Sequence, residues 1–229
     1  MNRRRLQSLL AVAAIIGLST SARADLVLSQ LVVDIAPAGN SRSDIEIWNN
    51  GSDPAYVEAA PREIQNPGTA AQNGNADPDP EKLGLLVSPA QMILEPGQRR
   101  LLRIAAISST FDRERVYRVT VKPVVGELTS ESSALKVLIG YDVLVIVRPK
   151  EMRPHVSATR AGSNLTLQND GNVSVELLDG KQCAQGTDNC TKLPDDRIYS
   201  GATKTIQIAP DRRVFYKLKV SGKLISAEF

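Results

Sequence analysis

The sequence predicts an all-β protein built from two β-domains. Short runs rich in Val, Ile, Leu and Thr recur along the chain, and Gly and Pro punctuate the intervals between them. No long amphipathic stretch shows the period of a helix. Without the leader described next, the chain has about 205 residues, which suits one large or two small domains.

Residues 1–24 have the pattern of a secretory signal peptide. A basic segment, Arg3 to Arg5, precedes the apolar run 9–18, and Ala22-Arg23-Ala24 fits the small-x-small pattern of signal peptidase sites. We expect cleavage before Asp25 and export of the remaining chain. The formal net charge of +3 depends on four arginines of this segment, so the exported part is nearly neutral and nothing global indicates nucleic acid or an anionic membrane as partner.

Residues 25–149 predict an N-terminal immunoglobulin-like domain. About seven strands separated by turn signals are typical of such a sandwich. The stretch 66–82, rich in Asn, Gly, Ala and Pro, predicts a surface loop. The expected strands are 26–35, 44–50, 55–64, 84–89, 91–107 with a turn at Pro96-Gly97, 114–124, and the long apolar run 134–149.

Residues 150–229 predict a smaller C-terminal β-sandwich. Pro149 ends the first unit because proline cannot continue a central strand, and 150–154 reads as a short linker. The strands that follow are shorter and less apolar: 155–161, 164–170, 174–180, 203–209 and 213–221.

The two cysteines, Cys183 and Cys190, predict a disulfide. Both lie in the exported part, where an oxidising compartment favours a bridge between close cysteines. A redox motif needs closer spacing and a zinc site needs more ligands. Closing so short a loop stabilises the fold by about 2–3 kcal/mol on the chain-entropy account.

Catalytic and metal-binding patterns are missing from the sequence. The single histidine, His155, sits beside Pro154, and no nucleophile motif accompanies it. The acidic loop Asp77, Asp79 and Glu81 lacks the Gly and Glu that an EF-hand requires. We therefore expect no enzyme activity, no metal, no cofactor and no small-molecule substrate.

The run ALKVLIGYDVLVIVRP, residues 134–149, is too long for an ordinary strand. Strands usually have 3–10 residues, and this one is interrupted only by Lys136, Gly140 and Asp142 before Arg148-Pro149. It is also too short and too charged for a membrane helix. Two explanations are open from the residues alone: the run fills its own core or covers an edge by dimerising, or it serves a partner.

Three segments resemble the periplasmic pilus-assembly chaperones. VSPAQMILEPGQRRLLRI (87–104) is similar to their pattern V-x-P-P-x-x-x-L-x-P-G-Q-x-x-x-L-R-I, and DRERVYRVTVKPV (112–124) resembles their D-R-E-S signature. Their first domain also ends in an apolar strand closed by Arg-Pro. Arg118 and Thr120 depart from the signature, which suggests a divergent member, of the archaic or alternative branch.

The resemblance implies two immunoglobulin-like domains in a boomerang, without catalysis. In that family the last strand of the first domain completes a pilin subunit that lacks a strand, and the chaperone delivers the subunit to an outer-membrane usher. Such β-augmentation combines backbone hydrogen bonds with side chains that fill alternate pockets. The matching donor residues here are Leu135, Val137, Ile139, Tyr141 and Val143.

The resemblance is incomplete where the family binds the subunit's terminal carboxylate. Gln30 and Leu144 stand at the usual Arg and Lys positions, and neither forms a charge-assisted bond. Arg118 and Lys122 on the neighbouring strand are our candidates for the missing positive charge; a solvated outer face is the other interpretation.

A salt bridge near the domain junction is the last feature that the resemblance implies. Glu114 and Arg148 match two of its members, and the third, an acid in the second domain, has no counterpart near residues 216–222. We therefore expect a Glu114–Arg148 pair.

Two other functions are alternatives to a chaperone for an exported β-sheet protein. A pilus or surface subunit would carry one incomplete domain and a free apolar N-terminal extension, whereas this chain enters its first strand directly and carries two domains. An adhesion-type module for a small ligand or carbohydrate calls for an aromatic-lined pocket, and aromatic residues are only 4% of the chain. Self-association through the apolar run stays open.

Overall fold

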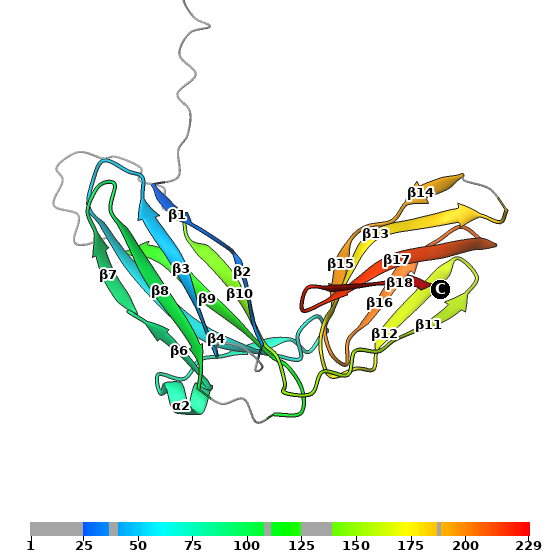
Figure 1. Ribbon diagram of the computed structural model, residues 1–229, viewed down its shortest axis with the longest axis horizontal. Helices are drawn as coiled ribbons and strands as arrows, with labels where there is room; N and C mark the ends of the chain where they lie inside the picture. Colours follow the sequence, from blue (N-terminus) through cyan, green and yellow to red (C-terminus); the bar gives the residue numbers. More distant parts are fainter. Residues whose placement is uncertain (1–24, 37–40, 108–110, 125–138, 187–188) are drawn as a thin grey trace, which may run out of the picture.

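The computed structural model describes residues 25–36, 41–107, 111–124, 139–186 and 189–229. Figure 1 shows two β-sandwiches set at an angle and joined at one end, with strands β1–β10 in one lobe and β11–β18 in the other. The prediction of an all-β chain with two sandwich domains is confirmed. The expected signal peptide, residues 1–24, lies outside the described residues.

Two sheets form the N-terminal sandwich. Sheet 1 has the order β1-β3-β8-β6, and sheet 2 has the order β2-β10-β9-β4-β5 with β7 also paired to β4. The strands of sheet 1 are β1 (Leu26–Leu28), β3 (Arg42–Asn49), β8 (Arg99–Ala106) and β6 (Leu85–Ser88). Those of sheet 2 are β2 (Val32–Ile35), β10 (Tyr141–Val147), β9 (Arg115–Val124), β4 (Ala55–Gln65), β5 (Asn73–Asn75) and β7 (Gln91–Leu94).

The first expected strand, 26–35, is in fact two strands in different sheets. β1 runs antiparallel to β3 in sheet 1, and β2 runs parallel to β10 in sheet 2. The chain thus crosses from one layer to the other at residues 29–31. The expected loop 66–82 also contains β5 and one helical turn, α2 (Pro80–Leu83), which Asp79 caps by accepting a hydrogen bond from the Glu81 amide.

Alternating side chains of the two sheets fill the N-terminal core. Ile45 and Leu102 point inward from sheet 1 and Val121 and Val145 from sheet 2, all without solvent exposure. This is the inward-facing alternation of a sandwich core.

The C-terminal sandwich also has two sheets, ordered β11-β12-β16 and β14-β13-β17-β18, with β15 paired to β13. Cys183 and Cys190 form the expected disulfide between β13 and β14. The strands are β11 (Val156–Ala161), β12 (Asn164–Asn169), β13 (Val175–Ala184), β14 (Cys190–Lys192), β15 (Asp196–Ile198), β16 (Thr203–Gln207), β17 (Arg212–Val220) and β18 (Lys223–Glu228).

A buried polar contact joins the two domains. Arg148 Nη1 lies 2.7 Å from Glu114 Oε2, and the same guanidinium donates to both carboxylate oxygens of Asp34. The C-terminal domain contributes Ser174, whose amide donates to Glu114 and whose carbonyl accepts from Arg148. The second acid on Arg148 therefore comes from β2 of the first domain.

Electrostatics favours the charged form of Arg148. Burial alone lowers the pKa of this guanidinium, but the hydrogen bond to Asp34 and the charges of Asp34 and Glu114 outweigh burial and raise its pKa. The contact is thus an ion-pair network with both charges on Arg148 and Glu114 shielded from water.

Asn172 supplies the second part of the joint. Its side-chain amide donates to the backbone carbonyls of Asp112 and Glu151. Its own backbone carbonyl accepts from the Glu114 amide. A short loop of the second domain, residues 171–174, therefore holds both the last turn before β9 and the linker.

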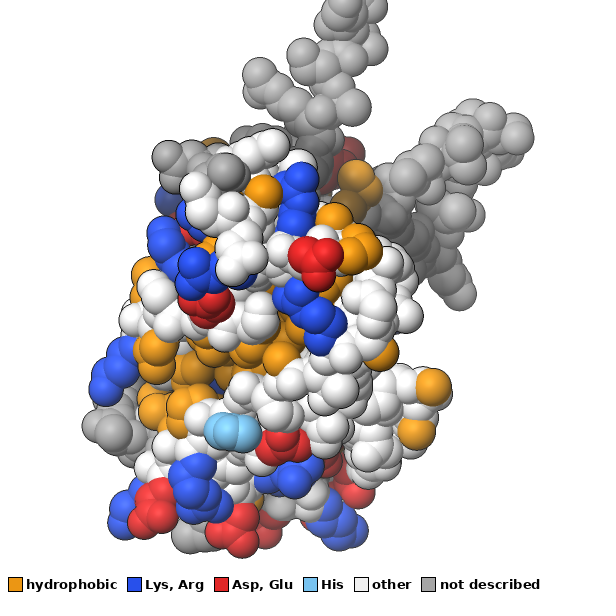
Figure 2. Space-filling model, turned by 90° about the vertical axis from the view of Figure 1, so that its right-hand side faces the viewer, with side chains coloured by type: hydrophobic (Ala, Val, Ile, Leu, Met, Phe, Trp, Pro, Cys, Tyr) orange, Lys and Arg blue, Asp and Glu red, His pale blue; other side chains and the backbone are white. Residues whose placement is uncertain are grey.

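Two further observations concern the part of the chain that the structure describes. Its one helix is too short to cross a bilayer, and no three His, Cys, Asp or Glu side chains of the described ranges gather as metal ligands would. Viewed from the C-terminal domain, hydrophobic side chains gather in the middle of the molecule and charged ones lie around them (Figure 2).

Candidate functional site

The long apolar run ends in strand β10, which covers Tyr141–Val147. Ile139 and Gly140 precede it outside any strand. Leu135 and Val137 lie outside the described residues. Of the five expected donor residues, the structure therefore places three.

The start of β10 has an open edge. β10 pairs with β9 over its whole length, from Tyr141 opposite Val121 to Val147 opposite Arg115. β2 pairs only with Leu144–Val147. Among the described residues, Tyr141–Val143 thus pair with a strand on one side only. The Asp142 carbonyl accepts from Arg118 Nη1 at 3.3 Å, but no described strand covers the other backbone edge.

The inward face of β10 belongs to the domain's own core. Val143 has no solvent exposure and packs with the core, and half-buried Tyr141 donates its hydroxyl to the Leu26 carbonyl at 2.6 Å. Both residues share the face of Val145, because strand side chains alternate. In this structure Val143 cannot enter a partner, whereas Ile139 is 56% exposed.

Two exposed apolar side chains lie where β2 begins to pair with β10. Leu31 and Val32 are each half exposed, and the Leu31 carbonyl accepts from the Leu144 amide at the point where β2 joins β10. The open edge is therefore bordered by apolar side chains on the β2 side.

The outward face of β10 lines the space between the domains. Leu144 and Ile146 form a buried cluster with Val116 of β9, and Tyr199 of the second domain packs against it. Burial raises the pKa of the Tyr199 hydroxyl. Leu144 is thus an apolar contact between domains, and the Gln30 side chain donates to the Ser43 hydroxyl. Neither residue is a cation.

The two cations expected to replace them each face a carboxylate. Arg118 Nε lies 3.9 Å from Asp142 Oδ2, and Lys122 Nζ lies 3.4 Å from Glu58 Oε2. A third cation joins Arg118: Arg62 of β4 lies directly opposite it in the sheet and donates to the same Asp142 oxygen at 3.0 Å.

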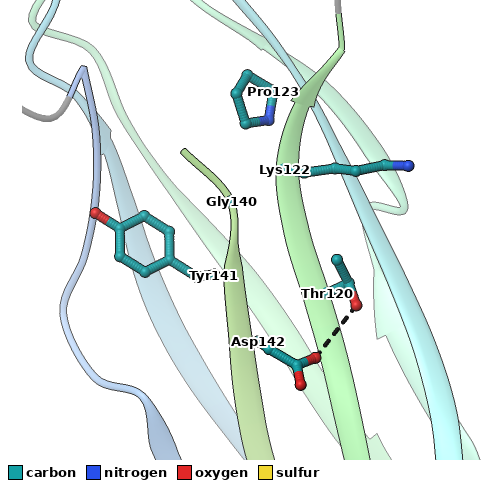
Figure 3. Close-up of a pocket in the computed structure, with 6 residues that line it drawn as sticks. All are labelled: Thr120, Lys122, Pro123, Gly140, Tyr141 and Asp142. Carbon is teal, nitrogen blue, oxygen red and sulfur yellow. Dashed lines mark hydrogen bonds between the residues drawn. The ribbon is translucent and has the colours of Figure 1, made fainter. Parts of the chain in front are cut away.

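A shallow hollow lies beside these charges, at the start of β10. Its volume is about 390 Å³, and its lining residues come from β9, from the first two residues of β10 and from Gly140 just before that strand. Figure 3 shows Asp142 hydrogen-bonded to Thr120 while Tyr141 points to the opposite side of the strand. The lining residues are Thr120, Lys122, Pro123, Gly140, Tyr141 and Asp142.

Sequence reasoning missed Arg62 and Asp142. The alternation of the expected strand 55–64 put Arg62 on the same face as Glu58, but only the β4–β9 register places it opposite Arg118. Asp142 interrupts the apolar run in the sequence. In β10 its side chain lies on the outward face, opposite Thr120. No local sequence pattern predicts a pair such as Arg62 and Asp142, which lie on different strands.

Solved pilus chaperones share this fold. The class 5 fimbriae chaperone CfaA is 24% identical with a TM-score of 0.70, and the alignment covers 89% of this chain and 98% of CfaA. A chain of the Salmonella enterica SafA pilin–SafB chaperone complex is 16% identical, with a TM-score of 0.62 and coverage of 92% and 98%.

A chain of the CsuC–CsuE chaperone–tip subunit complex of archaic Csu pili from Acinetobacter baumannii is 15% identical. Its TM-score is 0.59, and the alignment covers 90% of this chain and 98% of that one. At these identities the likeness establishes the fold.

The family assignment comes from the sequence itself. No curated protein matches the chain. Residues 26–153 match the model of the pili and flagellar-assembly chaperones, PapD N-terminal domain, which spans the first sandwich and the linker. This match agrees with the motifs at 87–104 and 112–124. The chain belongs to the family of pilus-assembly chaperones.

Proposed function

We propose that this pilus-assembly chaperone binds pilin subunits in the periplasm by donor-strand complementation. The observation that carries the proposal is the open edge of β10: no strand of the described residues pairs with Tyr141–Val143 on the β2 side, and Ile139 is exposed. An exposed apolar strand edge promotes aggregation unless a partner covers it. A subunit with an unfinished sandwich is such a partner.

The run 134–140 supplies the side chains for the subunit in this proposal. Leu135, Val137 and Ile139 stand at alternate positions of the sequence before Tyr141 and Val143, so an extended strand formed on the subunit would present their side chains on one face. Burying an isoleucine as exposed as Ile139 contributes up to about 2 kcal/mol. Val143 contributes indirectly, by fixing the strand from within the core.

Arg118 and Arg62 are the proposed partners of the subunit's terminal carboxylate. Both guanidiniums lie on the outward face beside the apolar cluster of Leu144. A carboxylate binds arginine more strongly than a neutral acceptor, and each arginine has donors to spare. Lys122, four residues further along β9 and paired with Glu58, is the weaker candidate.

The experiment is capture of a pilin subunit encoded beside the chaperone gene. After co-expression, a tagged chaperone is purified from the periplasm and the bound subunit is quantified. The variant Val137→Asp/Ile139→Asp introduces two charges into the donor run and is expected to lower capture by more than about 100-fold, since an unpaired buried charge is costly. Capture equal to that of the unmodified chain would refute the proposal.

A matched control separates this effect from a general loss of stability. Leu224 and Ile225 of β18 are exposed apolar residues of an edge strand, 58% each, in the other domain. The variant Leu224→Asp/Ile225→Asp makes the same chemical change and is expected to capture the subunit as the unmodified chain does.

Export and delivery complete the proposal. The leader pattern of residues 1–24 directs the chain to the periplasm, and an outer-membrane usher receives the chaperone–subunit complex, as in the family. In the free state, self-association through the open edge is the competing use of the same surface. The alternative role as a surface subunit is not favoured, because the first domain matches a chaperone family.

A further inference from the structure

Asp142 holds both arginines of the proposed carboxylate site in the free chaperone. Arg62 Nη2 donates to its Oδ2 at 3.0 Å, Arg118 Nη1 donates to its backbone carbonyl at 3.3 Å, and Thr120 donates to its Oδ1 at 3.2 Å. Arg62 Nη1 in turn donates to Thr120. An internal carboxylate thus occupies the position that a bound terminal carboxylate would need.

The contacts are weaker than the bidentate ion pairs of Arg103 and Arg115. Arg103 and Arg115 each donate two hydrogen bonds to one carboxylate, at 2.8 Å or less. Arg62 gives the Asp142 carboxylate one hydrogen bond, and Arg118 Nε stays 3.9 Å from it. Since bidentate pairs are the strong ones, the Asp142 cluster is the easier to exchange.

The cluster is also accessible to solvent. The side chains of Arg62, Arg118 and Asp142 are 37%, 35% and 44% exposed. Exposed ion pairs contribute little to stability, so an incoming carboxylate can replace Asp142 without a large loss to the fold. Asp142 is the second residue of β10 and lies three residues from Ile139, which puts the exchange at the base of the donor run.

We propose that Asp142 is an internal competitor: in the free chaperone its carboxylate binds Arg62 and offsets the charge of Arg118 across 3.9 Å, and the terminal carboxylate of a subunit displaces it. This inference rests on the proposed carboxylate site. Asp142 thereby sets a threshold, so that stray anions bind poorly and a subunit carboxylate, brought in by the donor strand, binds by local concentration.

The test is a titration with N-acetylglycine, a minimal terminal carboxylate, against N-acetylglycinamide at matched ionic strength. Binding is followed by the NMR signals of the Arg62 and Arg118 Nε–H groups. In Asp142→Asn the affinity for N-acetylglycine is expected to rise about three- to tenfold, because the competing charge is gone. Asp142→Glu keeps the charge, so its affinity for N-acetylglycine is expected to equal that of the unmodified protein. N-acetylglycinamide is expected to bind to none of the three proteins.

The matched control is Asp44→Asn. Asp44 pairs with Arg103 on sheet 1, so this variant changes the net charge equally and is expected to leave the Arg62 and Arg118 titrations unchanged. A purely structural Asp142 would give equal or weaker carboxylate binding in Asp142→Asn, and that result overturns the inference while the carboxylate site stands.

A second outcome has a different meaning. If neither the unmodified protein nor Asp142→Asn binds N-acetylglycine more tightly than N-acetylglycinamide, Arg62 and Arg118 do not form a carboxylate site. The proposed role of Asp142 is then refuted as well. Subunit capture through the donor run would still be decided by the Val137→Asp/Ile139→Asp variant.

Discussion

Replacing Arg148 by leucine is the sharpest test of how the domains are joined. The guanidinium is 1% exposed, and so is the Glu114 carboxylate that it contacts at 2.7 Å. In Arg148→Leu, Glu114 keeps only the Ser174 amide as a partner, because its other oxygen has none among the described residues. Asp34 is 34% exposed and can be rehydrated.

The expected magnitude follows from that burial. Removing one partner of a buried ion pair costs about 3–5 kcal/mol, since the other charge is left without compensation. Arg148→Leu should therefore lower the free energy of unfolding by about 3–5 kcal/mol, whereas Arg103→Leu, which breaks an exposed bidentate pair with Asp44, should lower it only slightly.

Urea unfolding measures both losses. Trp48, the only tryptophan, lies in β3 and reports the first domain by fluorescence, while circular dichroism follows both domains. The double variant Arg148→Leu/Glu114→Leu is expected to be more stable than Arg148→Leu alone, because it removes the stranded charge. If Arg148→Leu unfolds at the same urea concentration as Arg103→Leu, the joint does not depend on this buried pair.

Three further predictions concern each domain separately. Replacing both Cys183 and Cys190 by serine should lower the stability of the second domain by about 2–3 kcal/mol, measured by urea unfolding; an unchanged midpoint would contradict it. Val143→Asp should prevent folding of the first domain and Ile139→Asp should leave its urea midpoint unchanged, since the first side chain is fully buried and the second is exposed; equal midpoints would show that the two positions are not distinguished by burial. Burial raises the pKa of Tyr216 from 10.0 to about 12, so its contribution to stability is complete below pH 10 and is lost as the pH rises toward 12; the urea midpoint of Tyr216→Phe should fall less steeply over that range, and an equal slope would refute the shift.

Local patterns were enough for the fold class and for most of the longer strands, because alternation and turn residues are local properties; the short strands β5, β14 and β15 and the final strand β18 were not expected. The turn at Pro96-Gly97, for instance, separates β7 from β8 as expected. The sheet to which a strand belongs is not local. The run 26–35 contains no Gly or Pro to mark a break, yet β1 and β2 pair with strands about 20 and 110 residues further along the chain, in opposite layers.

The same limit explains the site. Asp34 reaches Arg148 because β2 pairs in parallel with β10, opposite Ile146, and nothing near residue 34 in the sequence indicates that partner. Arg62 and Asp142 likewise meet across three strands. The run Val143–Val147 is apolar at every position, so its pattern could not tell which side chains enter the core and which line the space between the domains.

Side chains alternate along β10, so one face of this short strand packs in the core of the first domain and the other lines the space between the two domains. A slip of one residue would send Asp142 and Leu144 into the core and expel Val143, so the register of β10 has to be fixed before a subunit arrives. Contacts at both ends fix it: the Tyr141 hydroxyl binds the Leu26 carbonyl, and Arg148, just after the strand, is held by Asp34. Because neither contact uses the open backbone edge of Tyr141–Val143, the strand can be locked in place and still offer that edge to a partner.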